Sequence, residues 1–223
     1  MNTSIKSLRF LILSGFALLL AAAVLRVVEH RRRPAQVGQG ETSLPVLSRM
    51  TDFRLTNQLG AEVTLDTLHD RVWVGDIIFT RCPGPCVRMS ETMRRLHAEL
   101  PSGGRVGLFS LTADPVHDTP EVLGRYAERF GADPGRWLFL SGSQDEIYRL
   151  ATQDLLLVVA DNQADPTAPP EDLFLHSTKL VVIDGEGQVR AAFDGEDAAS
   201  VKRVTEAVQA LIEQEQGKSG KSS

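Results

Sequence analysis

The sequence predicts an α/β domain with a central mixed sheet. Short apolar runs of strand length alternate with stretches of helical period between residues 51 and 213, which is the pattern of an α/β fold. The last elements are a strand hairpin and an amphipathic helix, so part of the sheet is expected to be antiparallel. The 223 residues are enough for one core of ordinary size and an N-terminal extension.

The N-terminal extension is expected to be a membrane anchor. Residues Phe10–Leu25 carry no charge, and the apolar run reaches Val28 if Arg26 extends its charged end to the membrane surface. We therefore assign residues 1–33 as a single transmembrane helix with basic flanks. A cleaved signal peptide ending near Ala21–Ala23 is the alternative, and the apolar run beyond these alanines favours the anchor.

Charge is distributed unevenly along the chain. Residues 1–33 contain six Lys and Arg residues and one acid, which leaves 18 basic and 28 acidic residues in the remainder. An acidic domain argues against nucleic acid as a partner. Four arginines follow the apolar run and two basic side chains precede it, and this balance alone would place the domain in the cytoplasm.

Two polar segments bound the domain. Residues 34–50 contain Pro and Gly and have no sustained period, so we expect a linker. Residues 214–223 are expected to be a disordered tail. The domain itself is therefore expected at residues 51–213.

The first half of the domain leads to a pair of cysteines. Residues 52–65 predict two strands joined at Leu59–Gly60, followed by a short helical turn at residues 64–70. Val72–Phe79 is almost entirely apolar, which predicts a buried central strand. A helix is expected at about Cys86–Leu100, because its apolar residues keep helical spacing.

The second half continues the alternation of strands and helices. A helix is expected to begin with Thr119 as its N-cap and Pro120 as its first residue, and Gly131 ends it. The other expected elements are strands at 105–111, 137–140 and 155–159, a helix at 143–152, a Pro-rich loop at 161–171, a hairpin of 173–183 with 188–193, and a helix at 197–213. This order suits a thioredoxin-like fold.

The two cysteines of the chain, Cys82 and Cys86, lie where the buried strand gives way to a helix. A disulfide between them would close a very small loop and would add little stability, so the pair indicates a redox or metal site. A helix N-terminus and the nearby Arg81 and Arg88 both favour a thiolate, which is the nucleophile and the metal ligand. Pro85 lacks an N–H and suits the first turn of that helix.

Soft thiolates favour Cu(I) or zinc, and imidazole suits copper in both oxidation states. A third ligand has to come from elsewhere in the chain. His176 stands out because it begins a strand after a Pro-rich loop that could fold over the cysteines. His30 lies in the membrane flank, His97 is expected to be solvated at the far end of the helix, and the remaining histidines lie in polar turns. From position alone, a histidine with a structural role remains the commoner case.

Four segments carry a resemblance to a known family: IIFTRCPGPC, SLTADPVHDTPEVLGRYAERFG, RWLFLSG and FLHSTKLVVIDGEG. In this order and at similar spacings they resemble the Sco/SenC copper chaperones, over most of residues 51–210. The resemblance implies a thioredoxin fold that binds copper through Cys82, Cys86 and His176.

The resemblance also implies a place and a task. Its members are anchored by one N-terminal helix with the domain outside the bacterial cytoplasm, so we expect a single-pass membrane protein facing the periplasm or the outer side of the inner membrane. They deliver copper to the binuclear copper site of cytochrome c oxidase. The implied partners are therefore the copper-site subunit of that oxidase and, further, other copper chaperones or thiol reductants.

The sequence departs from the family pattern at two positions of the cysteine loop. The family carries an acid after Cys-Pro and a proline after the second cysteine, where this chain has Gly84 and Val87. The missing carboxylate removes negative charge from the surroundings of the site, which tunes a metal centre.

Other side chains near the motif have simpler interpretations. Met89 and Met93 share the cysteine face of the helix and are expected to be core residues rather than copper ligands. Asp114 and Asp118 are expected to cap the next helix and shape the turn before it rather than to bond to the cysteine loop. Lys179 is expected to be solvated.

A thiol–disulfide oxidoreductase is the alternative to a metallochaperone. Cys82 would attack a target disulfide and Cys86 would resolve the mixed disulfide, or the pair would reduce the cysteines of the oxidase subunit. The Cys-x3-Cys spacing and His176 count against a dedicated disulfide exchanger, whereas the absent acid and proline count in its favour.

Overall fold

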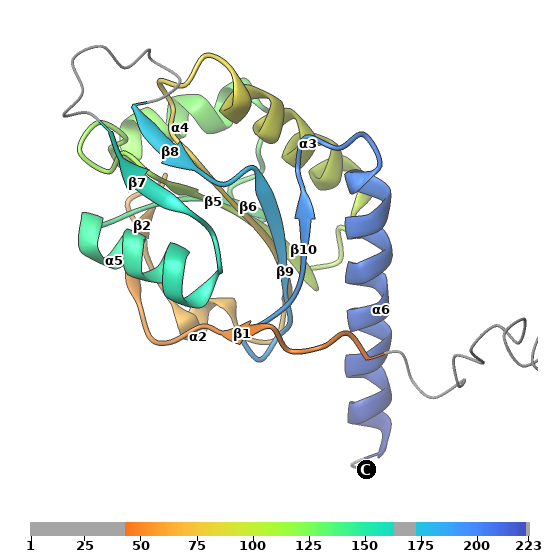
Figure 1. Cartoon of the computed structure of the whole chain (residues 1–223). Coiled ribbons are helices and arrows are strands. Elements are labelled where there is room, and N and C mark those ends of the chain that lie inside the picture. Colours follow the sequence, from red (N-terminus) through yellow and green to blue (C-terminus); the bar gives the residue numbers. More distant parts are fainter. Residues whose placement is uncertain (1–42, 163–172, 222–223) are drawn as a thin grey trace, which may run out of the picture. The chain divides into compact units, whose positions relative to one another are not determined.

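An eight-stranded mixed sheet runs through the part of the chain that the computed structural model describes, residues 43–162 and 173–221 (Figure 1). Its strands lie in the order β1-β10-β9-β4-β5-β6-β2-β3, and β7 and β8 form a separate two-stranded sheet. The strands are β1 (Ser48–Arg49), β2 (Arg54–Asn57), β3 (Glu62–Thr64), β4 (Val72–Ile78), β5 (Val106–Thr112), β6 (Trp137–Ser141), β7 (Val159–Asp161), β8 (Phe174–His176), β9 (Lys179–Ile183) and β10 (Gln188–Asp194).

The centre of the sheet is the parallel pair β4 and β5, in which every residue is buried. Two glycines in this pair make room for aromatic rings of the neighbouring strand. A side chain at Gly107 would meet the ring of Trp73 at 2.3 Å, and one at Gly75 would meet the ring of Phe109 at 2.3 Å. Burial on both faces explains why β4 reads as a nearly continuous apolar run.

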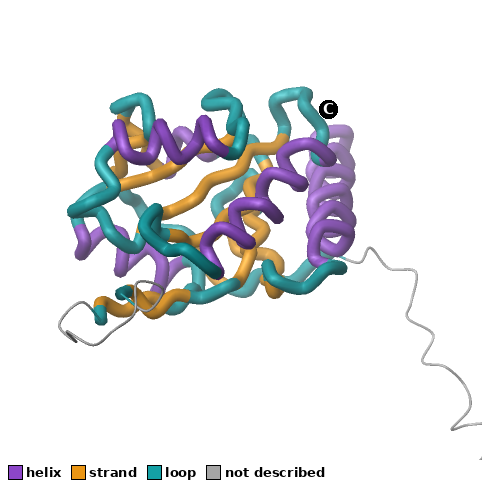
Figure 2. The backbone as a smooth tube through the Cα atoms, turned by 90° about the horizontal axis from the view of Figure 1, so that it is seen from above, coloured by secondary structure: helices purple, strands orange, loops and turns teal. Residues whose placement is uncertain are grey.

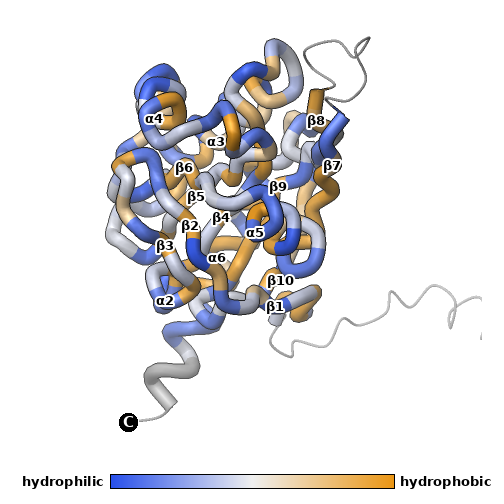
Figure 3. Tube along the Cα trace, turned by 90° about the vertical axis from the view of Figure 1, so that its left-hand side faces the viewer, coloured by the Kyte–Doolittle hydropathy of each residue, from blue (hydrophilic) through white to orange (hydrophobic). Residues whose placement is uncertain are grey.

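Helices lie on both sides of the strands (Figure 2). They are α2 (Leu65–Leu68), α3 (Pro85–Glu99), α4 (Pro120–Arg129), α5 (Gln144–Arg149), which continues into a π-helical turn (Leu150–Asp154), and α6 (Ser200–Lys221). α3 packs on β4 and on α6, while α4 packs on β6. Figure 3 shows hydrophobic and hydrophilic turns alternating along α4, and its residues Leu123, Tyr126 and Ala127 are buried.

Most predicted elements are confirmed. The mixed α/β fold is present, and the hairpin of β9 and β10 pairs Val182 with Ala191. Thr119 caps α4 by accepting a hydrogen bond from the N–H of Val122, and Pro120 occupies the first turn. These features were predictable because they depend on residues close together in the sequence.

The structure differs from the expected boundaries in four places. The strand expected at 155–159 lies instead at Val159–Asp161, as β7. Ser48–Arg49, in the segment expected to be a linker, pairs with β10 as an edge strand. The single strand expected at 173–183 is broken, and its first part, β8, pairs with β7 instead of joining the main sheet. Helix α6 continues to Lys221, through residues expected to be a disordered tail.

The predicted membrane anchor, residues 1–33, lies outside the described residues. Within the described ranges, no helix combines the length and the apolar character needed to cross a bilayer.

Candidate metal centre

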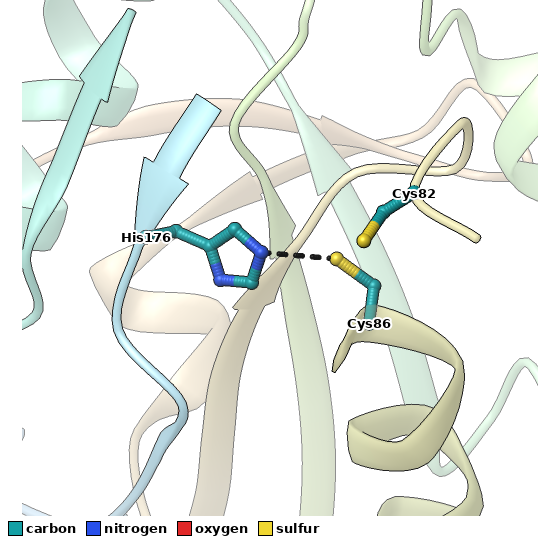
Figure 4. Close-up of side chains that lie close together, drawn as sticks. All are labelled: Cys82, Cys86 and His176. Carbon is teal, nitrogen blue, oxygen red and sulfur yellow. Dashed lines mark hydrogen bonds between the residues drawn. The ribbon is translucent and has the colours of Figure 1, made fainter. Parts of the chain in front are cut away.

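Cys82, Cys86 and His176 come together at one point of the fold (Figure 4). One potential ligand atom from each residue lies within 4.8 Å of those of the other two. Among these atoms, Cys86 Sγ and His176 Nε2 form a hydrogen bond at 3.0 Å. Both cysteines are free thiols and both are buried. The structure thus brings together the three residues that the sequence analysis selected.

The thiols are held by the connection between β4 and α3. The N–H of Cys82 donates to the carbonyl of Phe79 at 3.2 Å, which turns the chain back at the end of the strand. Gly84 is the N-cap residue of α3 and Pro85 is its first residue. The N–H of Phe79 donates to Cys86 Sγ at 3.4 Å, so strand and helix fix this sulfur together. Both sulfurs therefore lie at the N-terminal end of a 15-residue helix, where the helix dipole favours negative charge.

His176 reaches the thiols from the two-stranded sheet. It pairs with Val159 of β7, and its ring meets the ring of Phe79 edge-on at 5.6 Å between centroids. His176 Nδ1 lies 3.2 Å from the carbonyl oxygen of Ser177. A carbonyl can only accept, so the Nδ1–H of His176 donates this hydrogen bond, and Nε2 is the ring nitrogen that faces Cys86.

The two thiols differ in acidity because they share one proton. The Cys86 thiol donates a hydrogen bond to the sulfur of Cys82, and this bond, with smaller contributions from His176 and from backbone N–H groups, lowers the pKa of Cys82 to about 4. The same bond and burial raise the pKa of Cys86 far above its ordinary value. At neutral pH the cysteine pair therefore holds one thiolate and one thiol. A metal ion bound by both sulfurs would displace the remaining proton.

Two aspartates bond to the loop that carries the cysteines. Asp118 accepts hydrogen bonds from the N–H and hydroxyl of Thr80 and from the hydroxyl of Thr112. Asp114 pairs with Arg81, the residue before Cys82, at 2.6 Å. Asp114 shapes the turn before α4 as expected, by accepting a hydrogen bond from the N–H of His117. Neither aspartate caps the helix, because Thr119 occupies the cap, and both bond to the cysteine loop.

The remaining candidates lie apart from the cluster. Met89 and Met93 are fully buried core residues, as expected. Lys179 is exposed, also as expected. His97 was expected to be solvated, but its ring packs against Trp137 and its Nε2 is buried without a hydrogen-bond partner among the residues that the structure describes.

A family model described as SCO1/SenC matches residues 43–213 of the chain. The chain belongs to the SCO1/SenC family. A SCO1 protein homolog of Bacillus subtilis (strain 168) is 29% identical over 153 residues, covering 68% of this chain and 76% of the relative.

Solved structures of Sco proteins have the same fold. BsSco is 26% identical with a TM-score of 0.63, covering 76% of this chain and 98% of that chain, and is described as a member of the Sco family of cytochrome c oxidase assembly proteins with a disulfide switch. The apo Sco1 protein of Thermus thermophilus is 28% identical with a TM-score of 0.60, covering 78% of this chain and 99% of that chain.

The structure shows what a side chain at position 84 would contact. This chain has Gly84 there, where the resemblance to the SCO1/SenC family implies an acid. A side chain at Gly84 would have Arg88 Nη1 as its nearest neighbour, at 4.0 Å. Arg88 pairs instead with Glu196 at 2.6 Å, on the loop before α6. The cation that a loop acid would meet therefore already has a carboxylate partner in this member of the family.

One buried residue of the site was missed by the sequence analysis. Asp76 lies in β4 and is fully buried; its charge raises the pKa of Cys86, and the nearby His176 lowers the pKa of Asp76. The available signal was a single acid inside the apolar run Val72–Phe79. An acid in a strand buried on both faces is rare without a partner or a role.

Proposed function

We propose that this SCO1/SenC protein is a copper metallochaperone that binds copper through Cys82, Cys86 and His176. The observation that carries the proposal is the cluster of two sulfurs and one imidazole nitrogen within 4.8 Å. Thiolates are soft ligands that suit Cu(I), and imidazole suits both copper oxidation states. A structural zinc site would need a fourth protein ligand, and the described residues place no further His, Cys, Asp or Glu in the cluster.

The task we propose is delivery of copper to the binuclear copper site of a respiratory cytochrome c oxidase, whose copper-site subunit would be the partner. Support comes from family membership and from the description of BsSco as belonging to a family of cytochrome c oxidase assembly proteins. Transfer would proceed by ligand exchange, with cysteines of the target replacing Cys82 and Cys86 on the metal.

The proposed location is the outer side of a bacterial inner membrane, with residues 1–33 as a single-pass anchor. The apolar run and its basic flanks support an anchor. The resemblance to anchored family members supports the outward orientation, against the charge balance around the run.

Copper stoichiometry of the reduced full-length chain tests the binding proposal. We expect about one tightly held copper in the wild type and loss of tight binding in His176→Ala, because the variant removes one of three ligands. His97→Ala is the matched control, since His97 lies at the far end of α3 and should leave binding intact. A wild-type chain that retains no copper would refute the proposal.

Besides the absent acid and proline of the loop, the thiol–disulfide alternative has one structural observation in its favour, the low pKa of Cys82. It gives the imidazole only a smaller part, the hydrogen bond that helps to lower that pKa. An oxidoreductase would keep its thiol chemistry in His176→Ala and lose it in Cys82→Ala, so the same variants separate the two functions.

A further inference from the structure

A carboxyl group without a hydrogen-bond partner lies inside the sheet, near the end of β4 that leads to the thiols. Asp76 is fully buried, and neither of its carboxyl oxygens makes a hydrogen bond of normal geometry with the described residues; the side chain of Ser110 beside it lowers the pKa of Asp76 but does not outweigh the effect of burial. No Lys or Arg of the described chain forms an ion pair with it. Buried polar groups are nearly always paired, because an unpaired one destabilises the fold. Its presence in an otherwise apolar strand therefore suggests a function.

Asp76 faces the side of the sheet that carries the thiol helix. Its partner in the β5 register, Ser110, accepts a hydrogen bond from the indole of Trp137. The ring of Trp137 in turn packs against His97 of α3. Residues directly opposite each other in a ladder lie on the same face, so Asp76 and Ser110 both point towards this helix layer.

The groups that face Asp76 include part of the proposed metal centre. The charge of Asp76 raises the pKa of Cys86 on α3 and that of Tyr126 on α4, whose hydroxyl bonds to Ser90 of α3, and the nearby His176 of β8 lowers the pKa of Asp76. It has no hydrogen bond to any of these groups. Its influence on the centre is therefore electrostatic, and no cation of the described residues neutralises it.

We propose that Asp76 is a positioning residue of the copper centre, whose uncompensated carboxylate favours Cu(II) over Cu(I). This inference rests on the proposed function. Cu(II) bound by two thiolates and a neutral imidazole has no net charge, whereas Cu(I) with the same ligands has a charge of −1. A fixed negative charge nearby therefore destabilises the Cu(I) form more than the Cu(II) form.

The same argument applies to the chain without metal. When a dithiol such as dithiothreitol reduces a Cys82–Cys86 disulfide, the S–S bond breaks and the reagent becomes a cyclic disulfide. One of the two reagent protons stays on the cysteine pair and the other is released, because the N-terminal end of α3 favours one thiolate there. This step also adds one negative charge to the site. The carboxylate of Asp76 should oppose it and lower the reduction potential of the pair.

The test uses the full-length chain as wild type, Asp76→Asn and Asp76→Ala, at pH 8. Burial raises the pKa of Asp76 to about 7, so the wild-type carboxyl is mostly ionised at that pH. Two midpoint potentials are measured: that of Cu(II)/Cu(I) in the copper-loaded chain, and that of disulfide/dithiol in the metal-free chain against dithiothreitol. Asp145→Asn is the matched control, because it neutralises an exposed aspartate on α5.

We expect both variants to shift both equilibria towards the reduced form by about tenfold, the effect of one buried unit charge at a distance of several ångströms. The two replacements differ in shape and share only the loss of charge, so an equal shift in both identifies charge as the cause. Asp76→Ala also serves if the Asn variant fails to fold. Unchanged potentials in both variants, or an equal shift in Asp145→Asn, would overturn the inference. A wild-type chain that binds no copper would refute the proposed function, while the metal-free potentials would still test Asp76.

Discussion

Replacing Asp76 by Asn should make the protein more stable, and increasingly so as the pH rises. Burial is the main cause that raises the pKa of Asp76 from 3.8 in the unfolded chain to about 7 in the folded one. Between these two pH values the folded state holds a proton that the unfolded state has lost. The stability of the wild type therefore falls as the pH rises through this window, and Asn, which does not titrate, removes the loss.

The size of the effect follows from the two pKa values. Each unit of difference corresponds to about 1.4 kcal/mol, so the full loss is about 4 kcal/mol. Since part of it has already occurred below pH 5, about 3 kcal/mol remains between pH 5 and pH 8. The quantity to follow is the difference in unfolding free energy between Asp76→Asn and the wild type, because contributions of other titrating groups cancel in it.

Urea unfolding monitored by tryptophan fluorescence would measure this difference, since Trp73 and Trp137 are both buried in the core. Asp145→Asn, on the exposed surface of α5, reports the pH response of removing a surface charge. A difference that stays constant from pH 5 to pH 8 would refute the reasoning. It would mean that Asp76 carries the same charge in the folded and the unfolded state over this range.

Three further predictions concern other contacts of the fold. In Cys86→Ala the pKa of Cys82 should rise above about 4, because the hydrogen bond from Cys86 is the main cause that lowers it; ultraviolet thiolate absorbance would follow the titration, and an unmoved midpoint would contradict the assignment. Asp118→Ala should destabilise the domain by about 2–4 kcal/mol in chemical unfolding, because three donors lose their acceptor; a cost below about 1 kcal/mol would mean that water replaces the carboxylate. Arg190→Met should cost about 3–5 kcal/mol by leaving the buried carboxylate of Asp184 without its cation. A cost below about 1 kcal/mol in chemical unfolding would show that the remaining hydrogen bonds from the N–H groups of Glu186 and Gln188 suffice.

The cysteine half of the site could be predicted from the sequence because its determinants are local. The apolar run Val72–Phe79 specifies a buried strand, and Pro85 suits the first turn of a helix. These few residues place Cys82 and Cys86 at a helix N-terminus, with no information needed from the rest of the chain.

The position of His176 depends instead on contacts between distant segments. Its strand joins β7 rather than the main sheet, and its ring packs on Phe79, almost a hundred positions earlier in the sequence. Local pattern predicted one continuous strand from 173 to 183 and gave no reason to break it. Its position after a Pro-rich loop made this histidine a candidate, and the resemblance to a family selected it.

Hydrogen-bond partners were the other part that the sequence could not supply. Asp118 and Thr119 are both residue types that cap helices, so a shift of one position in the start of α4 decides which of them is free to bond to Thr80. Asp76 could not be recognised as an unpaired carboxyl from the sequence. Its lack of a hydrogen bond of normal geometry is known only once the positions of all the described neighbouring groups are known.

The three side chains of the site are held by two different sheets. Both sulfurs belong to the frame of the main sheet, through the connection of β4 to α3, whereas the imidazole belongs to the hairpin of β7 and β8. Moving this hairpin would break no ladder of the eight-stranded sheet, but it would separate the buried ring of Phe174 from that of Phe79, 5.1 Å away between centroids. The position of the imidazole therefore depends on side-chain packing, and that of the sulfurs on the main sheet and α3.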